Sequence, residues 1–154
     1  MSESTKLLQA EIAADEQAIA RLYELLAKVW DTLESPEQTI VASYYLHNLY
    51  MAFEHIFERV AETFENQIAD KSQWHAQLLR RMTLDVPGMR PRLISDEAQE
   101  CLDELRRFRH VFRSAYTVSL DKERLNLVVQ RAKRLKALYA TEFAEFKKFL
   151  EQLG

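Results

Sequence analysis

Apolar side chains recur at three- and four-residue steps along almost the whole chain, and this periodicity most constrains the fold. An α-helix has about 3.6 residues per turn, so such steps align side chains into one stripe on a helix face. The 154 residues include only two glycines, Gly88 and Gly154. Hairpin turns draw on glycine for left-handed backbone conformations, so few hairpins are expected. The sequence therefore predicts long helices and no sheet.

Capping residues and breaks in the periodicity divide the chain into four long helices and one short one. We expect helices over residues 4–33, 36–66, 70–83, 96–118 and 121–153, with one substantial loop over 84–94. Ser35 before Pro36 suits an N-cap and first helical position. An up-and-down antiparallel bundle buries these stripes most economically, as a single domain over residues 1–154. A coiled coil or helical repeat is the alternative, but the stripes wander and the connections differ in length.

The composition is that of an ordinary globular protein, with 47 % hydrophobic and 29 % charged residues. A net charge of −3 gives no global positive field, so any RNA contact would need a local basic patch. No stretch approaches the ~18 apolar residues that span a bilayer. The N-terminal residues lack a signal-type apolar run, and the single Cys101 cannot form an internal disulfide. We therefore expect a cytoplasmic protein that makes no membrane contact.

The stretch from Leu105 to Tyr116 carries the candidate chemistry. On a helix, one stripe beside the core would hold Arg106, Arg109, Arg113 and Tyr116. A neighbouring polar line would hold Arg107, His110 and Ser114. A row of guanidinium groups can hold phosphates through forked hydrogen bonds. The spacing alone favours a plainer interpretation, in which the arginines form a solvated face paired with acidic side chains and the tyrosine and histidine are structural.

This stretch resembles the signature of the HEPN superfamily, and more closely that of the HepT-like proteins. The signature is an arginine, a polar residue, three more residues, a histidine, any residue and a tyrosine. Arg109, His110 and Tyr116 fill the arginine, polar and tyrosine positions, whereas Ser114 stands where the histidine is expected. The likeness extends over nearly everything after Ala42, in the segments 44–50, 54–59, 74–82, 86–91 and 142–150.

The resemblance implies a compact helical bundle that forms a homodimer, with the signature residues meeting in a cleft across its axis. It implies a metal-independent endoribonuclease without a cofactor, acting on RNA such as tRNA. In that mechanism the ribose 2′-hydroxyl attacks phosphorus, the histidine moves the proton and the arginine stabilises phosphate charge. HepT-like proteins are the toxins of type II HEPN/MNT toxin–antitoxin systems. The MNT nucleotidyltransferase antitoxin can transfer AMP to the motif tyrosine, here Tyr116.

Serine at position 114 puts the cleavage step in question. Its hydroxyl does not titrate near neutral pH, and general acid–base help is typically worth ~10²–10⁴-fold in rate. His110 lies four residues earlier, about 6 Å along the same helix face, and can substitute if Ser114 donates a hydrogen bond. Three hypotheses stay open: a ribonuclease toxin, a cleavage-inactive binding partner or substrate-binding subunit of a nucleotidyltransferase, and a helical dimer without a ligand.

Other candidate residues give weaker signals. The possible metal ligands on the second helix are His47, Glu54, His55 and Glu58. Helical di-metal sites repeat Glu-x-x-His on facing helices, and no second copy of this pattern occurs, so we expect no metal. His75 beside Trp74 is expected to pack. Arg90 and Arg92 are expected to be solvated in the loop, where they would at most extend a phosphate-binding surface.

Overall fold

The computed structural model describes residues 2–65, 74–114 and 121–153, except the side chains of Arg113 and Ser114. These ranges contain five α-helices and no β-strand. The helices are α1 (Glu3–Ala27), α2 (Pro36–Phe64), α3 (Trp74–Arg81), α4 (Asp96–Ser114) and α5 (Lys122–Gln152). The predicted all-α bundle of four long helices and one short one is therefore confirmed for the described residues.

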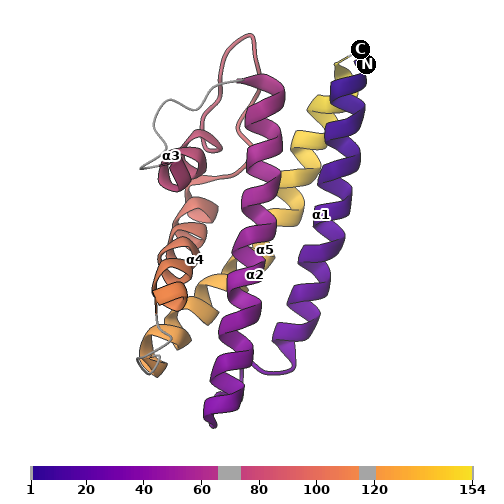
Figure 1. Cartoon of the computed structure of the whole chain (residues 1–154). Helices are drawn as coiled ribbons and strands as arrows, with labels where there is room; N and C mark the ends of the chain where they lie inside the picture. The colour runs from indigo at the N-terminus through magenta and orange to yellow at the C-terminus, as the bar shows by residue number, and fades with distance from the viewer. Residues whose placement is uncertain (1, 66–73, 115–120, 154) are drawn as a thin grey trace.

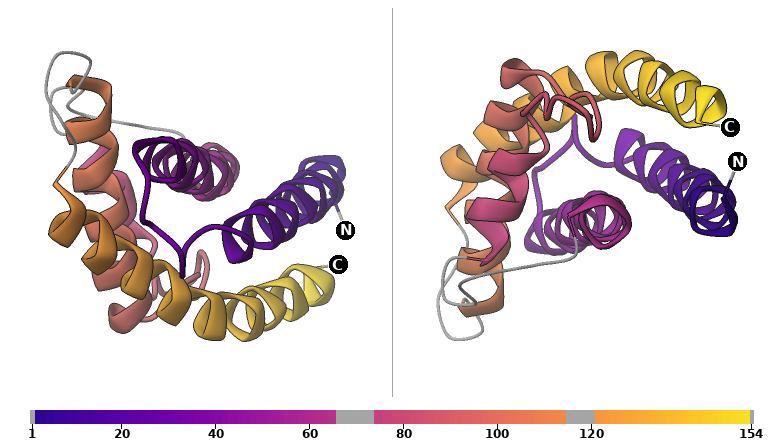
Figure 2. Two further views of the ribbon diagram at one scale, coloured as in Figure 1. Left: turned by 90° about the horizontal axis from the view of Figure 1, so that it is seen from below. Right: turned by 90° about the horizontal axis from the view of Figure 1, so that it is seen from above.

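The long helices alternate in direction along the chain, as Figure 1 shows. The start of α1 and the end of α5 lie together at one end of the bundle. Figure 2 shows α5 curving around the other helices, from the side of α4 to the side of α1, with α2 inside this arc. α2 consequently contacts every other helix, which explains why its buried face is broad.

Local capping explains where most helices begin. Ser35 accepts a hydrogen bond from the Gln38 N–H (3.1 Å), and the Gln38 side chain accepts one from the Ser35 N–H (3.0 Å), which completes a capping box. Asp121 accepts from the Glu123 N–H (3.0 Å) at the start of α5. These N-caps satisfy backbone donors that lack a partner in the first helical turn.

α1 departs from the sequence-based expectation at both ends. It begins at Glu3 rather than at residue 4, with Ser2 as its N-cap, which accepts a hydrogen bond from the Thr5 N–H (3.2 Å). Its last residue is Ala27 rather than a residue near 33, because the chain turns over residues 28–31. This turn brings the Trp30 side chain into the core, where only 9 % of it is exposed.

The core is built from aromatic side chains of α1, α2 and α5. Phe53 is fully buried and makes edge contacts with Tyr139 (5.3 Å between ring centroids) and Phe143 (5.9 Å). Tyr23 stacks on Tyr139, and its hydroxyl donates to the Ala132 carbonyl (2.8 Å). Burial of such rings supplies much of the driving force for folding, and the ring contacts fix how the helices pack.

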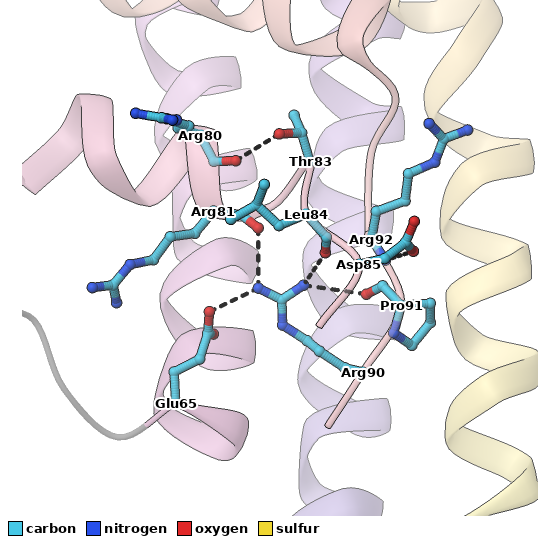
Figure 3. A network of polar contacts seen from close by, with 9 residues as sticks. All are labelled: Glu65, Arg80, Arg81, Thr83, Leu84, Asp85, Arg90, Pro91 and Arg92. Atoms are coloured by element: carbon cyan, nitrogen blue, oxygen red, sulfur yellow. Dashed lines mark hydrogen bonds and ion pairs between the residues drawn. The ribbon is translucent and has the colours of Figure 1, made fainter. Parts of the chain in front are cut away.

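The loop between α3 and α4 is held by a buried arginine (Figure 3). The Arg90 side chain is 0 % exposed and donates to the Glu65 carboxylate (2.7 Å). It also donates to three backbone carbonyls, those of Arg81 (3.1 Å), Leu84 (3.1 Å) and Pro91 (3.2 Å). The expectation that Arg90 is solvated was wrong, because the carbonyls of this tight loop turn inward and need donors. Arg92 is exposed, as expected.

This loop also sets the relative positions of α3 and α4. Its tip is a turn closed by an isolated bridge between Val86 and Arg90, with Gly88 at a φ of 76°. The Leu93 N–H donates to the Met82 carbonyl (2.8 Å), which ties the start of α4 to the end of α3. Only glycine adopts such a positive φ without strain, so Gly88 suits this turn. No described helix is long and apolar enough to cross a membrane.

Candidate functional site

The segment of α4 that carries the predicted motif packs against α2. Leu105 and Phe108 are buried and Phe112 is half-buried, so this face of α4 belongs to the core. Arg106 and Arg109 are half-buried at the edge of this stripe. The two arginines therefore lie where the sequence placed them, beside the core rather than fully in solvent.

The arginines of α4 differ in their partners. Arg106 pairs with Asp103 (Nη2 to Oδ1, 2.9 Å), and Arg107 pairs with the other oxygen of Asp103 (3.0 Å). Arg109 reaches across to α2, where its Nε–H donates to the Met51 sulfur (3.0 Å). Among the residues that the structure describes, Arg109 makes no ion pair. The expected pairing with acidic side chains is therefore found for Arg106 and Arg107, but not for Arg109.

A buried carboxylate lies on the face of α2 that meets α3 and α4. Glu54 is 3 % exposed, and the Tyr50 hydroxyl donates to its Oε2 (2.8 Å). The His75 Nδ1 lies 2.7 Å from the same oxygen. A carboxylate oxygen accepts, so the shared proton is assigned to Nδ1. His75 was expected to pack beside Trp74; it is instead bound to a buried acid, and its side chain is 42 % exposed.

The charges of α4 reach this buried group. Burial raises the pKa of Tyr50 well above its usual range, and the negative charge and hydrogen bond of Glu54 raise it further. The positive charges of Arg106 and Arg109 act in the opposite direction on the same pKa. Burial, followed by the charge of Glu54, also raises the pKa of Glu58. Tyr50 therefore stays protonated and donates to Glu54, and the arginines of α4 supply positive charge beside it.

We define the α2–α3–α4 seam as Tyr50, Glu54 and His75, which hydrogen bonds join, together with Arg106 and Arg109 of α4, whose charges act on Tyr50. α4 packs against both α2 and α3, so the seam joins the predicted basic stripe to a buried acid. The sequence analysis missed Tyr50 and the pairing of His75. The available signal was the four-residue step from Tyr50 to Glu54, which places both side chains on one helix face.

Several predicted site residues lie at or beyond the end of the described part of α4. Arg113 and Ser114 belong to the last turn of α4, and their side chains are outside the described residues. Tyr116 also lies outside the described residues. His110 is described and exposed. The assembly of Ser114 and Tyr116 with Arg109 therefore stays a prediction.

The possible metal ligands of α2 point in different directions. His55 binds Asp15 of α1 (Nδ1 to Oδ2, 2.6 Å). The His47 ring packs on Phe112 of α4 (5.5 Å between centroids). Within the described ranges, no three His, Cys, Asp or Glu side chains are grouped so that they could hold a metal ion.

The chain matches the model of a known protein family. The family model for HepT-like proteins matches residues 41–150, which is more than half of the chain. The protein therefore belongs to the HepT-like family of HEPN proteins. Neither a curated protein nor a solved structure matches the chain.

Proposed function

We propose that this protein is the toxin of a type II HEPN/MNT toxin–antitoxin system and that it cleaves RNA without a metal ion. Membership of the HepT-like family supports this proposal. The observation that carries it is the position of Arg109, which lies at the edge of the core with no acidic partner among the described residues. A guanidinium group in this position can bind a phosphate with two parallel hydrogen bonds.

Homodimerisation is part of the proposal. Large apolar side chains are exposed on α2 and α4, namely Ile40, Val41, Tyr44, Met51 and Val111. Ile40, Tyr44 and Met51 recur at helical spacing, so they share one face of α2. Met51 also contacts Arg109, which places the arginine beside this face. A second copy that covers the face would bring two such arginines toward one groove, and light scattering of the purified protein measures whether it dimerises.

RNA cleavage is the direct test of the proposed function. Purified protein incubated with tRNA in EDTA should cut it, because no step requires a metal ion. Arg109→Ala should lower the rate by roughly 10²–10³-fold, as for the loss of a group that stabilises transition-state charge. The matched control is Arg107→Ala, which removes the same charge from the same helix at a residue paired with Asp103 and Glu104. Equal losses in both variants would argue against a specific role for Arg109.

The antitoxin is expected to be an MNT nucleotidyltransferase that modifies Tyr116. Incubation with the product of the neighbouring gene, ATP and magnesium should add AMP to the wild-type protein, as mass spectrometry would detect. Tyr116→Phe should form the same complex without gaining mass. A complex that forms without any modification of the wild type would favour inhibition by binding alone.

The serine at position 114 favours a second candidate function. In this alternative, the protein is a cleavage-inactive HEPN domain that serves as the binding partner or substrate-binding subunit of a nucleotidyltransferase. Ser114→His distinguishes the two candidates, because it restores the residue type that the signature expects. RNA cutting by this variant alone would show an inactive natural protein, whereas cutting by the wild type would exclude the alternative.

A further inference from the structure

The Glu54–His75 pair has the form of an oriented acid–base group. A carboxylate that is 3 % exposed is costly to bury unless hydrogen bonds and opposite charge compensate it. Here Tyr50 and His75 both bind its Oε2, at 2.8 and 2.7 Å. Because Nδ1 faces Glu54, the second ring nitrogen of His75, Nε2, lies on the opposite edge of the ring. The histidine side chain is 42 % exposed, so a ligand can approach it.

This arrangement gives His75 what a general base needs. A carboxylate bound to one ring nitrogen fixes the tautomer and the ring orientation, and it stabilises the imidazolium that forms when the other nitrogen takes a proton. Arg109 reaches α2 at Met51, the residue after Tyr50, and Tyr50 binds the same carboxylate as His75. α4 packs against both α2 and α3, so the proposed proton carrier and phosphate-binding groups belong to three helices that contact one another.

We propose that His75 is the acid–base residue of RNA cleavage, with Glu54 and Tyr50 as its positioning residues. This inference rests on the proposed ribonuclease function and names the residue that supplies the chemistry that Ser114 lacks. His110 is the other histidine considered for this role. It follows Arg109 by one residue on α4, about 100° around the helix, and it is exposed.

The step balances without any further reactant. Nε2 of neutral His75 takes the proton of a ribose 2′-hydroxyl while the 2′-oxygen forms a bond to the adjacent phosphorus. The bond from phosphorus to the 5′-oxygen breaks, and the departing oxygen receives the proton back from the imidazolium, directly or through water. The products are a 2′,3′-cyclic phosphate and a 5′-hydroxyl. Arg106 and Arg109 would stabilise the charge on the phosphate oxygens.

The decisive experiment measures tRNA cleavage in EDTA by the full-length protein and two histidine variants. His75→Ala should lower kcat by about 10²–10⁴-fold with a much smaller change in KM. His55→Ala is the matched control, since His55 also binds a carboxylate of a neighbouring helix and is similarly exposed, at 49 % against 42 %. This control should cut RNA like the wild type.

Imidazole added to the buffer separates a chemical role of His75 from a structural one. It should restore part of the activity of His75→Ala, because a free base can occupy the vacated position, but none of the activity of Arg109→Ala. Loss of activity without such rescue, together with a lower midpoint of urea unfolding, would mean that His75 only docks α3 and would overturn the assignment.

The positioning role of Glu54 has its own readout. Glu54→Gln retains an oxygen acceptor for Tyr50 but removes the charge that stabilises the imidazolium, so kcat should fall and the pH profile of kcat should shift. If His75→Ala cuts RNA as well as the wild type and His110→Ala does not cut it, the acid–base role belongs to His110 instead. If the wild type cuts no RNA, the proposed ribonuclease function itself fails, and the role of His75 fails with it.

Discussion

Two glutamates bind basic side chains from the segments that follow, yet their environments differ. Glu65, the C-cap of α2, binds Arg90 in the loop before α4, and Glu54 of α2 binds His75 in α3. The two residues are about three helical turns apart in the sequence, so both carboxylates lie on the same side of α2. The Arg90 side chain is 0 % exposed and also bonds to three backbone carbonyls, whereas the His75 side chain is 42 % exposed.

The exposure of the basic side chain separates a structural role from a role in binding or catalysis. Both terminal nitrogens of Arg90 donate to groups of the protein itself (Figure 3). Arg90 therefore holds the loop and is poorly placed to bind a ligand. His75 has one nitrogen bound to a buried acid and a side chain that remains accessible. The Glu65–Arg90 network therefore serves stability, whereas the Glu54–His75 pair is the one we propose for proton transfer.

The largest expected effect on stability is that of Arg90→Met. The variant leaves Glu65 and three inward carbonyls without their donor, and breaking a buried ion pair on one side typically costs about 3–5 kcal/mol in the free energy of unfolding. Urea unfolding followed by circular dichroism measures this loss. Arg92→Met is the control, because Arg92 is exposed and its removal should stay within about 0.5 kcal/mol. Similar values for both variants would mean that Arg90 does not hold the loop.

A direct comparison of Glu65→Gln with Glu54→Gln tests the division between stability and chemistry. Glu65→Gln should lower the free energy of unfolding by roughly 1–3 kcal/mol, since it removes the charge that faces a buried guanidinium. Glu54→Gln should cost less, on the order of 1 kcal/mol, because its partner His75 is half-exposed and screened by water. For RNA cleavage the order should reverse, with Glu54→Gln impaired and Glu65→Gln near wild type. If the same variant is the more impaired one in both assays, the division between a structural and a catalytic glutamate fails.

The smallest effect concerns the pH dependence of stability at the seam. The pKa of Tyr50 is raised in the folded protein, so between the unfolded value of about 10 and the folded value the folded state holds more protons. Its contribution to stability is therefore complete below about pH 10 and is lost as the pH rises further, by up to about 1.4 kcal/mol per pH unit. Urea unfolding between pH 8 and 11 should show this decline.

Tyr50→Phe provides the check on that decline. The variant cannot ionise at this position, so its stability should fall less steeply above pH 10 than that of the wild type. At neutral pH the loss of the hydrogen bond to Glu54 should cost about 0.5–1.5 kcal/mol. Parallel pH curves for the two proteins would show that Tyr50 ionises in the folded state as readily as in the unfolded chain.

The elements that sequence alone predicted best are those that depend on neighbours along the chain. The N-cap Ser35 and the starts of α4 and α5 follow from side chains within one or two turns of one another. The end of α1 was predicted too late, because the turn after Ala27 depends on the burial of Trp30 rather than on a local break in the periodicity. The edge position of Arg109 was also predictable, since helical spacing determines it.

The amino-acid sequence by itself determined the helices, their apolar faces, the basic stripe of α4 and the likeness to HepT-like proteins. Only the tertiary structure decided that Arg90 is buried against Glu65 and that His75 binds Glu54. These partners are 25 and 21 residues apart in the chain and belong to different elements. Helical periodicity gives the face on which a side chain lies, whereas the packing of one helix on another decides which side chain it meets and how much water remains beside it.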